Sequence, residues 1–150
     1  MKYICTLIVV EDLKRSLDLY QKTLGLTIEH DLGENISFTC GLSLHLKHHF
    51  ETLIDTAISK RAHHSHELYF EEDDIETIYE KLETKKYEFV HGIKVQPWQQ
   101  RVFRFYDMDG HIIEVGEPLE AVVRRLRKDH NDITISEMMG MPIEFVNHVE

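Results

Sequence analysis

The chain has 150 residues, of which 42% are hydrophobic, which is enough for one compact domain and too little for two independent domains of ordinary size. Its formal charge of −10, from 27 acidic and 17 basic residues, argues against nucleic acid or an anionic membrane as a main partner. No apolar stretch approaches the roughly 20 residues that cross a bilayer. The 2 cysteines, Cys5 and Cys40, and a first segment without a cleavage signature favour a reduced, cytoplasmic protein.

The first part of the chain predicts a strand, a helix and three further short strands. Residues 3–10 form a continuous apolar run, typical of a strand buried on both faces, and Asp12 can cap a helix that ends at Gly25. The three strands that follow are expected at 26–30, 35–39 and 42–48. This order is that of a βαβββ module.

The second part of the chain predicts the same order of elements. A strand is expected at 67–71 and a helix begins at Asp74. Three more strands are expected at 88–94, 101–106 and 111–116. The sequence therefore predicts two βαβββ modules in an α+β fold.

A linker and a tail lie outside the repeat. The linker contains a candidate short helix at 52–60, and the tail begins at Pro118 with an amphipathic helix, followed by one or two short helices over 133–149. The expected organisation is a domain over 1–117 with modules 1–49 and 66–117 and linker 50–65, followed by a helical extension over 118–150.

Four side chains that could bind a metal stand at matching positions in the two modules. Cys5 and Glu67 are 62 residues apart, and each precedes the helix-capping Asp of its module by seven residues. His45 and Glu114 are 69 residues apart, and each stands four residues after a glycine in the last strand of its module. Such a period suits two related α+β modules that face each other, so we expect these four side chains to converge on one cleft.

Longer motifs resemble a known family. The segment Val9-Val10-Glu11-Asp12-Leu13, followed by Leu24-Gly25-Leu26, resembles the opening of the vicinal oxygen chelate superfamily. Residues 101–115 are similar to its closing strand pair, in which an Asp-Pro-Asp-Gly turn precedes a metal-binding Glu, and Met108 stands here in place of the Pro. The resemblance covers about residues 3–117 and is nearest to glyoxalase-like proteins. It implies that the two modules form a cupped mixed sheet around a cleft.

The resemblance also implies a metal and a reaction. The family's metal ligands match His45, Glu67, Glu114 and Cys5, although the family commonly has His, Gln or Glu where Cys5 stands. One nitrogen and two carboxylates suit an open site for Zn, Ni, Co, Mn or Fe(II). The implied metal-dependent enzyme chelates two neighbouring substrate oxygens and forms an enediolate, with Glu114 or Glu67 as the base, in isomerase or lyase chemistry.

Physical arguments from the strands weigh these roles against simpler ones. Burying the carboxylate of Glu114 in an apolar strand costs several kcal/mol unless a metal or hydrogen bonds compensate. The alternation of side chains along a strand turns His45 and Glu67 away from the apolar residues of their strands and toward the expected cleft. Both can equally be surface residues. The same holds for the histidines between residues 45 and 66. Cys5 is more often a small buried hydrophobe than a ligand. Arg101 and Arg104 differ in parity, so at most one can face the cleft.

Two other functions stay open at this point. The first is a metal-free small-molecule binding protein of the bleomycin-resistance type, in which a homodimer encloses the ligand. The second is docking or regulation by the tail, because residues 133–142 weakly resemble the start of a helix-turn-helix, although this segment lacks a basic face. We expect a homodimer with a small-molecule partner, and neither nucleic acid nor a membrane.

Overall fold

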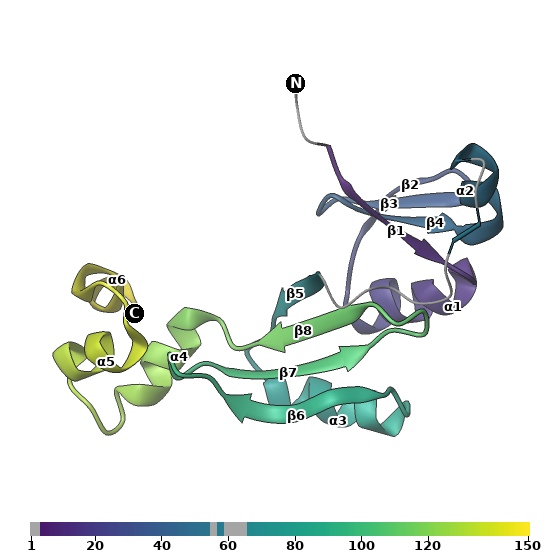
Figure 1. Cartoon of the computed structure of the whole chain (residues 1–150). Coiled ribbons are helices and arrows are strands. Elements are labelled where there is room, and N and C mark those ends of the chain that lie inside the picture. The colour runs from purple at the N-terminus through teal and green to yellow at the C-terminus, as the bar shows by residue number, and fades with distance from the viewer. Residues whose placement is uncertain (1–3, 55–56, 59–65) are drawn as a thin grey trace. The chain divides into compact units, whose positions relative to one another are not determined.

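The computed structural model describes residues 4–54, 57–58 and 66–150. The chain divides into two compact units, residues 1–62 with 107–110 (unit 1) and residues 63–106 with 111–150 (unit 2). Each unit contains one mixed sheet of four strands together with helices (Figure 1). The predicted α+β class built from two βαβββ modules is confirmed.

The sheet of unit 1 has the strand order β1-β4-β3-β2, with β1 parallel to β4 and the other pairs antiparallel. Asp12 caps the first helix, since its Oδ1 accepts a hydrogen bond from the backbone N–H of Arg15 at 3.0 Å. The elements are β1 (Thr6–Val10), α1 (Leu13–Leu17), the π-helix η1 (Asp18–Thr23), β2 (Ile28–Asp31), β3 (Asn35–Phe38), β4 (Leu42–Leu46) and α2 (Lys47–Ile54).

Unit 1 differs from the sequence-based prediction in two respects. β1 is buried on one face only, because Ile8 and Val10 are buried while Leu7 is 37% exposed. The last strand ends at Leu46, and the helix predicted at 52–60 instead begins at Lys47 and ends at Ile54. No Gly or Pro marks this boundary in the sequence, and residues 55–56 and 59–60 of the predicted helix lie outside the described residues.

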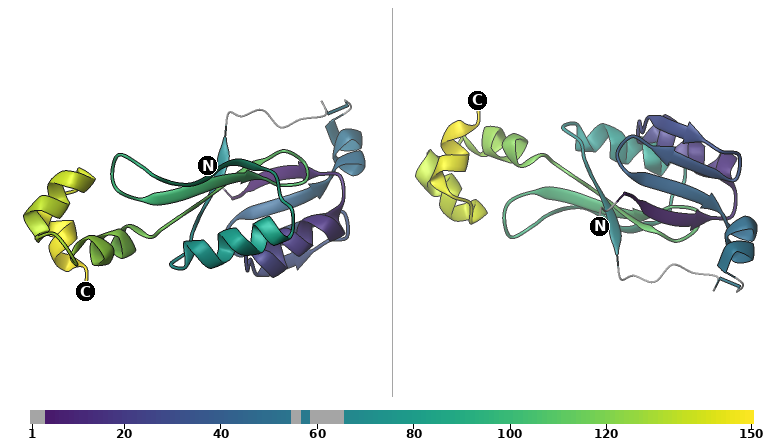
Figure 2. Two further views of the ribbon diagram at one scale, coloured as in Figure 1. Left: turned by 90° about the horizontal axis from the view of Figure 1, so that it is seen from below. Right: turned by 90° about the horizontal axis from the view of Figure 1, so that it is seen from above.

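The sheet of unit 2 has the matching order β5-β8-β7-β6, with β5 parallel to β8. Helix α3 lies along one face of this sheet (Figure 2), where Tyr79 contacts the ring of Phe103 with a centroid distance of 5.2 Å. The elements are β5 (Glu67–Glu71), α3 (Ile75–Thr84), β6 (Phe89–Val95), β7 (Arg101–Tyr106), β8 (Ile112–Gly116), α4 (Leu119–Leu126), α5 (Asp132–Met139) and α6 (Ile143–His148).

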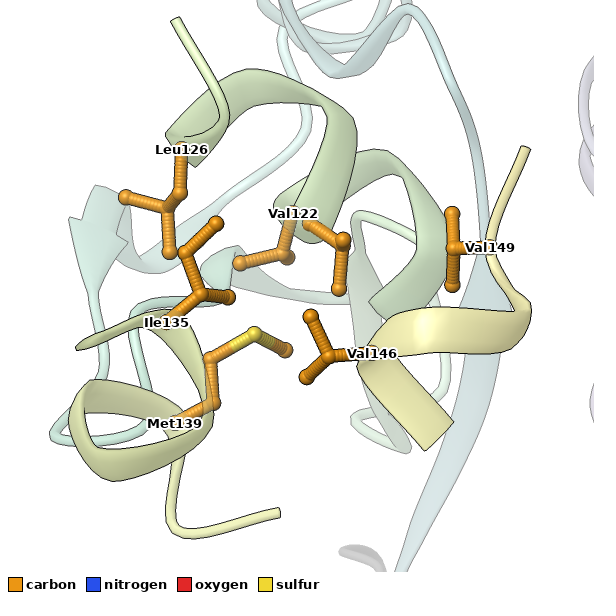
Figure 3. Packing of buried hydrophobic residues seen from close by; sticks show 7 residues of the cluster. Val122, Leu126, Ile135, Met139, Val146 and Val149 are labelled. Atoms are coloured by element: carbon orange, nitrogen blue, oxygen red, sulfur yellow. The ribbon is translucent and has the colours of Figure 1, made fainter. Parts of the chain in front are cut away.

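The three C-terminal helices form a small apolar core of their own (Figure 3). Its buried side chains come from all three helices and the residue after α6, and are Val122, Val123, Leu126, Ile135, Met139, Val146 and Val149. Arg127 joins the three helices, since it donates to the carboxylate of Asp132 and to the carbonyl oxygens of Val146 and Val149. The predicted helical C-terminal extension is therefore confirmed.

A buried carboxylate attaches this extension to the sheet. Glu117, which is 2% exposed, follows β8 and accepts hydrogen bonds from Arg101 Nε of β7 at 2.7 Å and from Arg125 Nη2 of α4 at 3.0 Å. Burial alone would raise the pKa of Glu117, but the hydrogen bonds from the two arginines outweigh it and the pKa is lowered. The ionised form of Glu117 therefore contributes to stability, and this contribution is lost as the pH falls from its usual pKa of 4.5 through its lowered pKa.

We expect Glu117→Gln to destabilise the fold by about 3–5 kcal/mol, because it leaves two arginines without their shared carboxylate. Urea unfolding followed by circular dichroism measures the effect, with Glu120→Gln on the exposed side of α4 as the matched control. Equal unfolding midpoints for the two variants would contradict the role assigned to Glu117.

Candidate functional site

The two faces of the unit 2 sheet differ in chemistry. In the strand register, Glu114 of β8 lies between Tyr69 of β5 and Arg104 of β7, so these side chains share one face with Glu67. The opposite face carries apolar residues that include Ile113, which is fully buried. The site residues that the sequence predicts for this unit, Glu67 and Glu114, therefore lie together on the polar face.

Arg104 is the centre of this polar face. Its Nε donates to Glu67 Oε2 at 2.8 Å, its Nη2 contacts Glu114 Oε2, and its Nη1 lies 3.2 Å from His91 Nε2. Arg101 contacts Glu76 of α3 instead, as the difference in parity between the two arginines requires. One guanidinium group therefore faces two carboxylates and one imidazole.

The guanidinium explains how Glu114 can be buried. Glu114 is only 6% exposed, and its Oε2 has no hydrogen bond of normal geometry within the described part of the chain. The ion pair with Arg104 supplies the compensating charge that a buried carboxylate requires. A metal ion is therefore not needed to account for the burial of Glu114.

His45, on β4 of unit 1, is part of a network of polar side chains that also includes Asn35, His49 and Glu34. Asn35 Nδ2 lies 3.2 Å from His45 Nδ1, and His45 Nε2 lies 2.8 Å from His49 Nδ1 on α2. His49 Nε2 in turn lies 3.3 Å from the carboxylate of Glu34. Both ring nitrogens of His45 therefore have protein partners.

The surroundings of His45 favour its neutral form. Burial lowers the pKa of His45, the neighbouring His49 lowers it further, and the carboxylate of Glu34 opposes them. His45 is 7% exposed, so the sequence-based alternative of a surface histidine does not describe its position. Cys5, by contrast, is exposed and precedes β1.

The residues predicted as metal ligands belong to different units. Cys5 and His45 are in unit 1, and Glu67 and Glu114 are in unit 2, so the convergence of all four stays a prediction. Over residues 4–54, 57–58 and 66–150, no three His, Cys, Asp or Glu side chains form a group that could hold a metal. Within unit 2 by itself, Arg104 already occupies both carboxylates, and within unit 1 His49 already occupies His45, so neither unit alone offers these side chains as a free ligand set.

Sequence reasoning missed several members of these two networks. His91 lies on β6, which pairs with β7 through an irregular register, and the sequence carries no signal of that register. His49 lies on α2 and Glu34 lies in the turn before β3, and both belong to the network of His45. The sequence predicted a later start for α2, so His49 was not expected beside His45. The sequence did give one signal. Arg101 and Arg104 are an odd number of residues apart on one strand, so their side chains must face opposite sides of the sheet. His63 and His64 of the histidine-rich stretch lie outside the described residues.

Two βαβββ modules, each with a polar sheet face, are typical of one class of small α+β proteins. The family model described as a glyoxalase-like domain matches residues 3–120, and the chain belongs to this family. The fold and the match together bear out the resemblance to the vicinal oxygen chelate superfamily. The match does not reach α5 or α6, which lie beyond it in the C-terminal extension.

Solved structures show the same fold. A protein of unknown function from Agrobacterium tumefaciens C58 is 36% identical, with a TM-score of 0.69 over 79% of this chain and 94% of that one. A glyoxalase-related enzyme from Fulvimarina pelagi is 20% identical, with a TM-score of 0.64 over 76% and 87%. The fosfomycin resistance protein of Listeria monocytogenes is 17% identical, with a TM-score of 0.58 over 79% and 94%.

The curated proteins gave no match. Among the helices in the described ranges, none is both long enough and apolar enough to cross a bilayer.

We expect the ring of His45 to titrate below its usual pKa of 6.5, which NMR of the ring nitrogens can measure. A lowered pKa in the folded state means that the folded protein binds fewer protons than the unfolded chain, so stability falls as the pH drops from about 6.5 through the lowered value. Removing this contribution with His45→Gln should flatten the decline in stability over that range. A His45 ring that titrates at or above 6.5 would contradict the assignment.

Proposed function

We propose that this glyoxalase-like protein is an isomerase or lyase for a small substrate with vicinal oxygens. The observation that carries the proposal is the meeting of the Glu67 and Glu114 carboxylates at one guanidinium on the polar face of unit 2. Membership of the family supports it, and so does the naming of the Fulvimarina pelagi relative as a glyoxalase-related enzyme.

The proposed chemistry is the removal of a proton from the carbon beside a substrate carbonyl group, which forms an enediolate. The side chain of Glu67 is 39% exposed and that of Glu114 is 8% exposed, so Glu67 is the carboxylate that a substrate on this face reaches first. Glu67 accepts the proton and returns it to the neighbouring carbon or oxygen, while Glu114 holds Arg104 in place. Because Arg104 pairs with both carboxylates, we write these steps with the side chains of the chain itself.

Three further expectations from the sequence belong to the same proposal. The substrate is a small molecule, the protein is a homodimer, and it acts in the cytoplasm. The negative net charge of −10 supports a partner other than nucleic acid or an anionic membrane.

We expect Glu67→Gln to lower kcat/KM by about 10²–10⁴-fold, because an amide cannot accept the substrate proton. The assays are hemithioacetal isomerisation, epimerisation of a 2-substituted acyl thioester, and exchange of the substrate's α-proton with D₂O followed by NMR. Glu114→Gln should also reduce the rate, since it frees the guanidinium that Glu114 positions.

Glu71→Gln is the matched control, because Glu71 lies four residues from Glu67 on β5 and its carboxylate accepts a hydrogen bond from Tyr69. Equal losses in the Glu67 and Glu71 variants would contradict a catalytic role for Glu67. If the wild type turns over none of these substrates and exchanges no α-proton, the isomerase reading fails and metal-free ligand binding becomes the better account.

A further inference from the structure

Tyr69 lies on the polar face of unit 2, beside the carboxylate proposed as the base. It is two residues from Glu67 on β5 and opposite Glu114 in the strand register, so all three side chains share one face. Tyr69 is 47% exposed, which leaves its hydroxyl group accessible to a substrate bound next to Glu67. When a base removes a carbon-bound proton, negative charge develops on the substrate carbonyl oxygen, and that oxygen needs a hydrogen-bond donor.

A buried amide fixes the position of the Tyr69 hydroxyl group. Gln100 is 5% exposed, and its Nε2 donates to the Tyr69 hydroxyl oxygen at 2.8 Å and to the carbonyl oxygen of Glu117 at 2.7 Å. Its Oε1 accepts a hydrogen bond from Trp98 Nε1 at 2.8 Å, so all three bonds define the orientation of the amide. Because the hydroxyl oxygen accepts from Gln100, its own proton points elsewhere and is donated to the exposed carboxylate of Glu71 at 3.0 Å.

A glycine on the neighbouring strand leaves space for this arrangement. Gly116 of β8 lies on the same face as Glu114, two residues away. A Cβ atom at Gly116 would lie 2.9 Å from Gln100 Nε2 and 3.2 Å from Tyr69 Cε2. The backbone of Gly116 is outside the left-handed region, so close packing and not conformation requires a glycine here. The missing side chain allows the ring of Tyr69 and the amide of Gln100 to lie over β8.

The surroundings of Tyr69 keep its hydroxyl group protonated. Burial raises the pKa of Tyr69, the hydrogen bond from Gln100 lowers it, and the hydrogen bond to Glu71 together with the charge of Glu71 raises it. The pKa of Tyr69 is therefore above its usual value of 10.0. At neutral pH the hydroxyl group has a proton to donate.

We propose that the Tyr69 hydroxyl group donates a hydrogen bond to the substrate carbonyl oxygen as the enediolate forms. This role rests on the proposed function and adds a second catalytic residue to it. Glu67 takes the carbon-bound proton, the C–H electron pair becomes the C=C bond, and the carbonyl π pair moves onto the oxygen. The Tyr69 O–H turns from Glu71 to that oxygen, and water replaces it at Glu71. Gln100 is a positioning residue, because it holds the phenol oxygen while the O–H turns.

The first test is exchange of the substrate α-proton in D₂O by Tyr69→Phe, which removes only the hydroxyl group. We expect kcat to fall by about 10²–10³-fold, the usual effect of removing one donor to an oxyanion. KM should change little, because the neutral carbonyl gains little from the donor before charge develops. Tyr79→Phe is the matched control, since its ring packs on Phe103 on the opposite face of the same sheet, and it should have the kcat of the wild type.

Gly116→Ala is a second variant, which moves the hydroxyl group without removing any polar group. The added methyl group displaces the amide of Gln100, and we expect kcat to fall here too. The double variant Tyr69→Phe with Gly116→Ala should be no slower than Tyr69→Phe alone, because no hydroxyl group remains to be displaced. Losses that multiply in the double variant would contradict the inference. Gly116→Ala alone provides the comparison with the wild type if Tyr69→Phe does not fold.

A binding measurement gives a readout that does not need turnover. Acetohydroxamate has two neighbouring oxygens on a planar unit, as an enediolate has. In buffer with EDTA, its binding can be followed by NMR of the indole N–H of Trp98, the single Trp of the chain, which is bonded to Gln100. We expect Tyr69→Phe to bind acetohydroxamate about tenfold more weakly than the wild type, and Tyr79→Phe to bind it equally well.

The two measurements separate this inference from the proposed function. If the wild type exchanges no α-proton but Tyr69→Phe binds acetohydroxamate more weakly, the isomerase proposal fails and the donor role of Tyr69 stands. If the wild type is active and Tyr69→Phe equals it in kcat and in binding, the activity stands and the inference is overturned. A wild type that does not bind acetohydroxamate also overturns the inference.

Discussion

A buried carboxylate must be paired with a positive charge, and the polar face of unit 2 is organised around that requirement. Glu114 is buried on a strand whose neighbouring residues Ile113 and Val115 pack into the core, so its charge cannot be left to solvent. Arg104, directly opposite it in the strand register, provides the charge and in turn draws in Glu67 and His91. The chemistry available on this face follows from how these charges are balanced.

The same requirement governs how the C-terminal extension is attached. Glu117 follows the same strand and is buried as completely as the core residues, with Arg101 and Arg125 as its partners. One of these arginines comes from the sheet and the other from α4. Two buried carboxylates, Glu114 within β8 and Glu117 directly after it, therefore have separate tasks. Glu114 organises the polar face, and Glu117 joins the sheet to a helical core that lies largely outside the family match.

Much of this fold could be predicted from the sequence because its signals are local. The alternation in residues 67–71 and the capping Asp residues at 12 and 74 depend on neighbouring residues only, and the structure reproduces them. The predicted start of α2 was wrong because no Gly or Pro in the sequence marks the point where the alternating pattern of β4 ends and the helix begins. The partners of the candidate site residues were harder still, since His91 and Arg104 meet through a bulged strand pair that no local pattern encodes. A sequence shows that a buried Glu114 needs a cation, but not which one.

The central claim is that this chain supplies the cation of its own site. Elemental analysis of the wild-type protein, purified without added metal or chelator, tests it most directly. The account predicts well below one equivalent of Zn, Ni, Co, Mn or Fe per chain, and no increase after incubation with each ion followed by desalting. Near-stoichiometric metal that is lost in a His45→Ala and Glu114→Ala double variant would contradict the account and establish the metal-dependent site that the family resemblance implies.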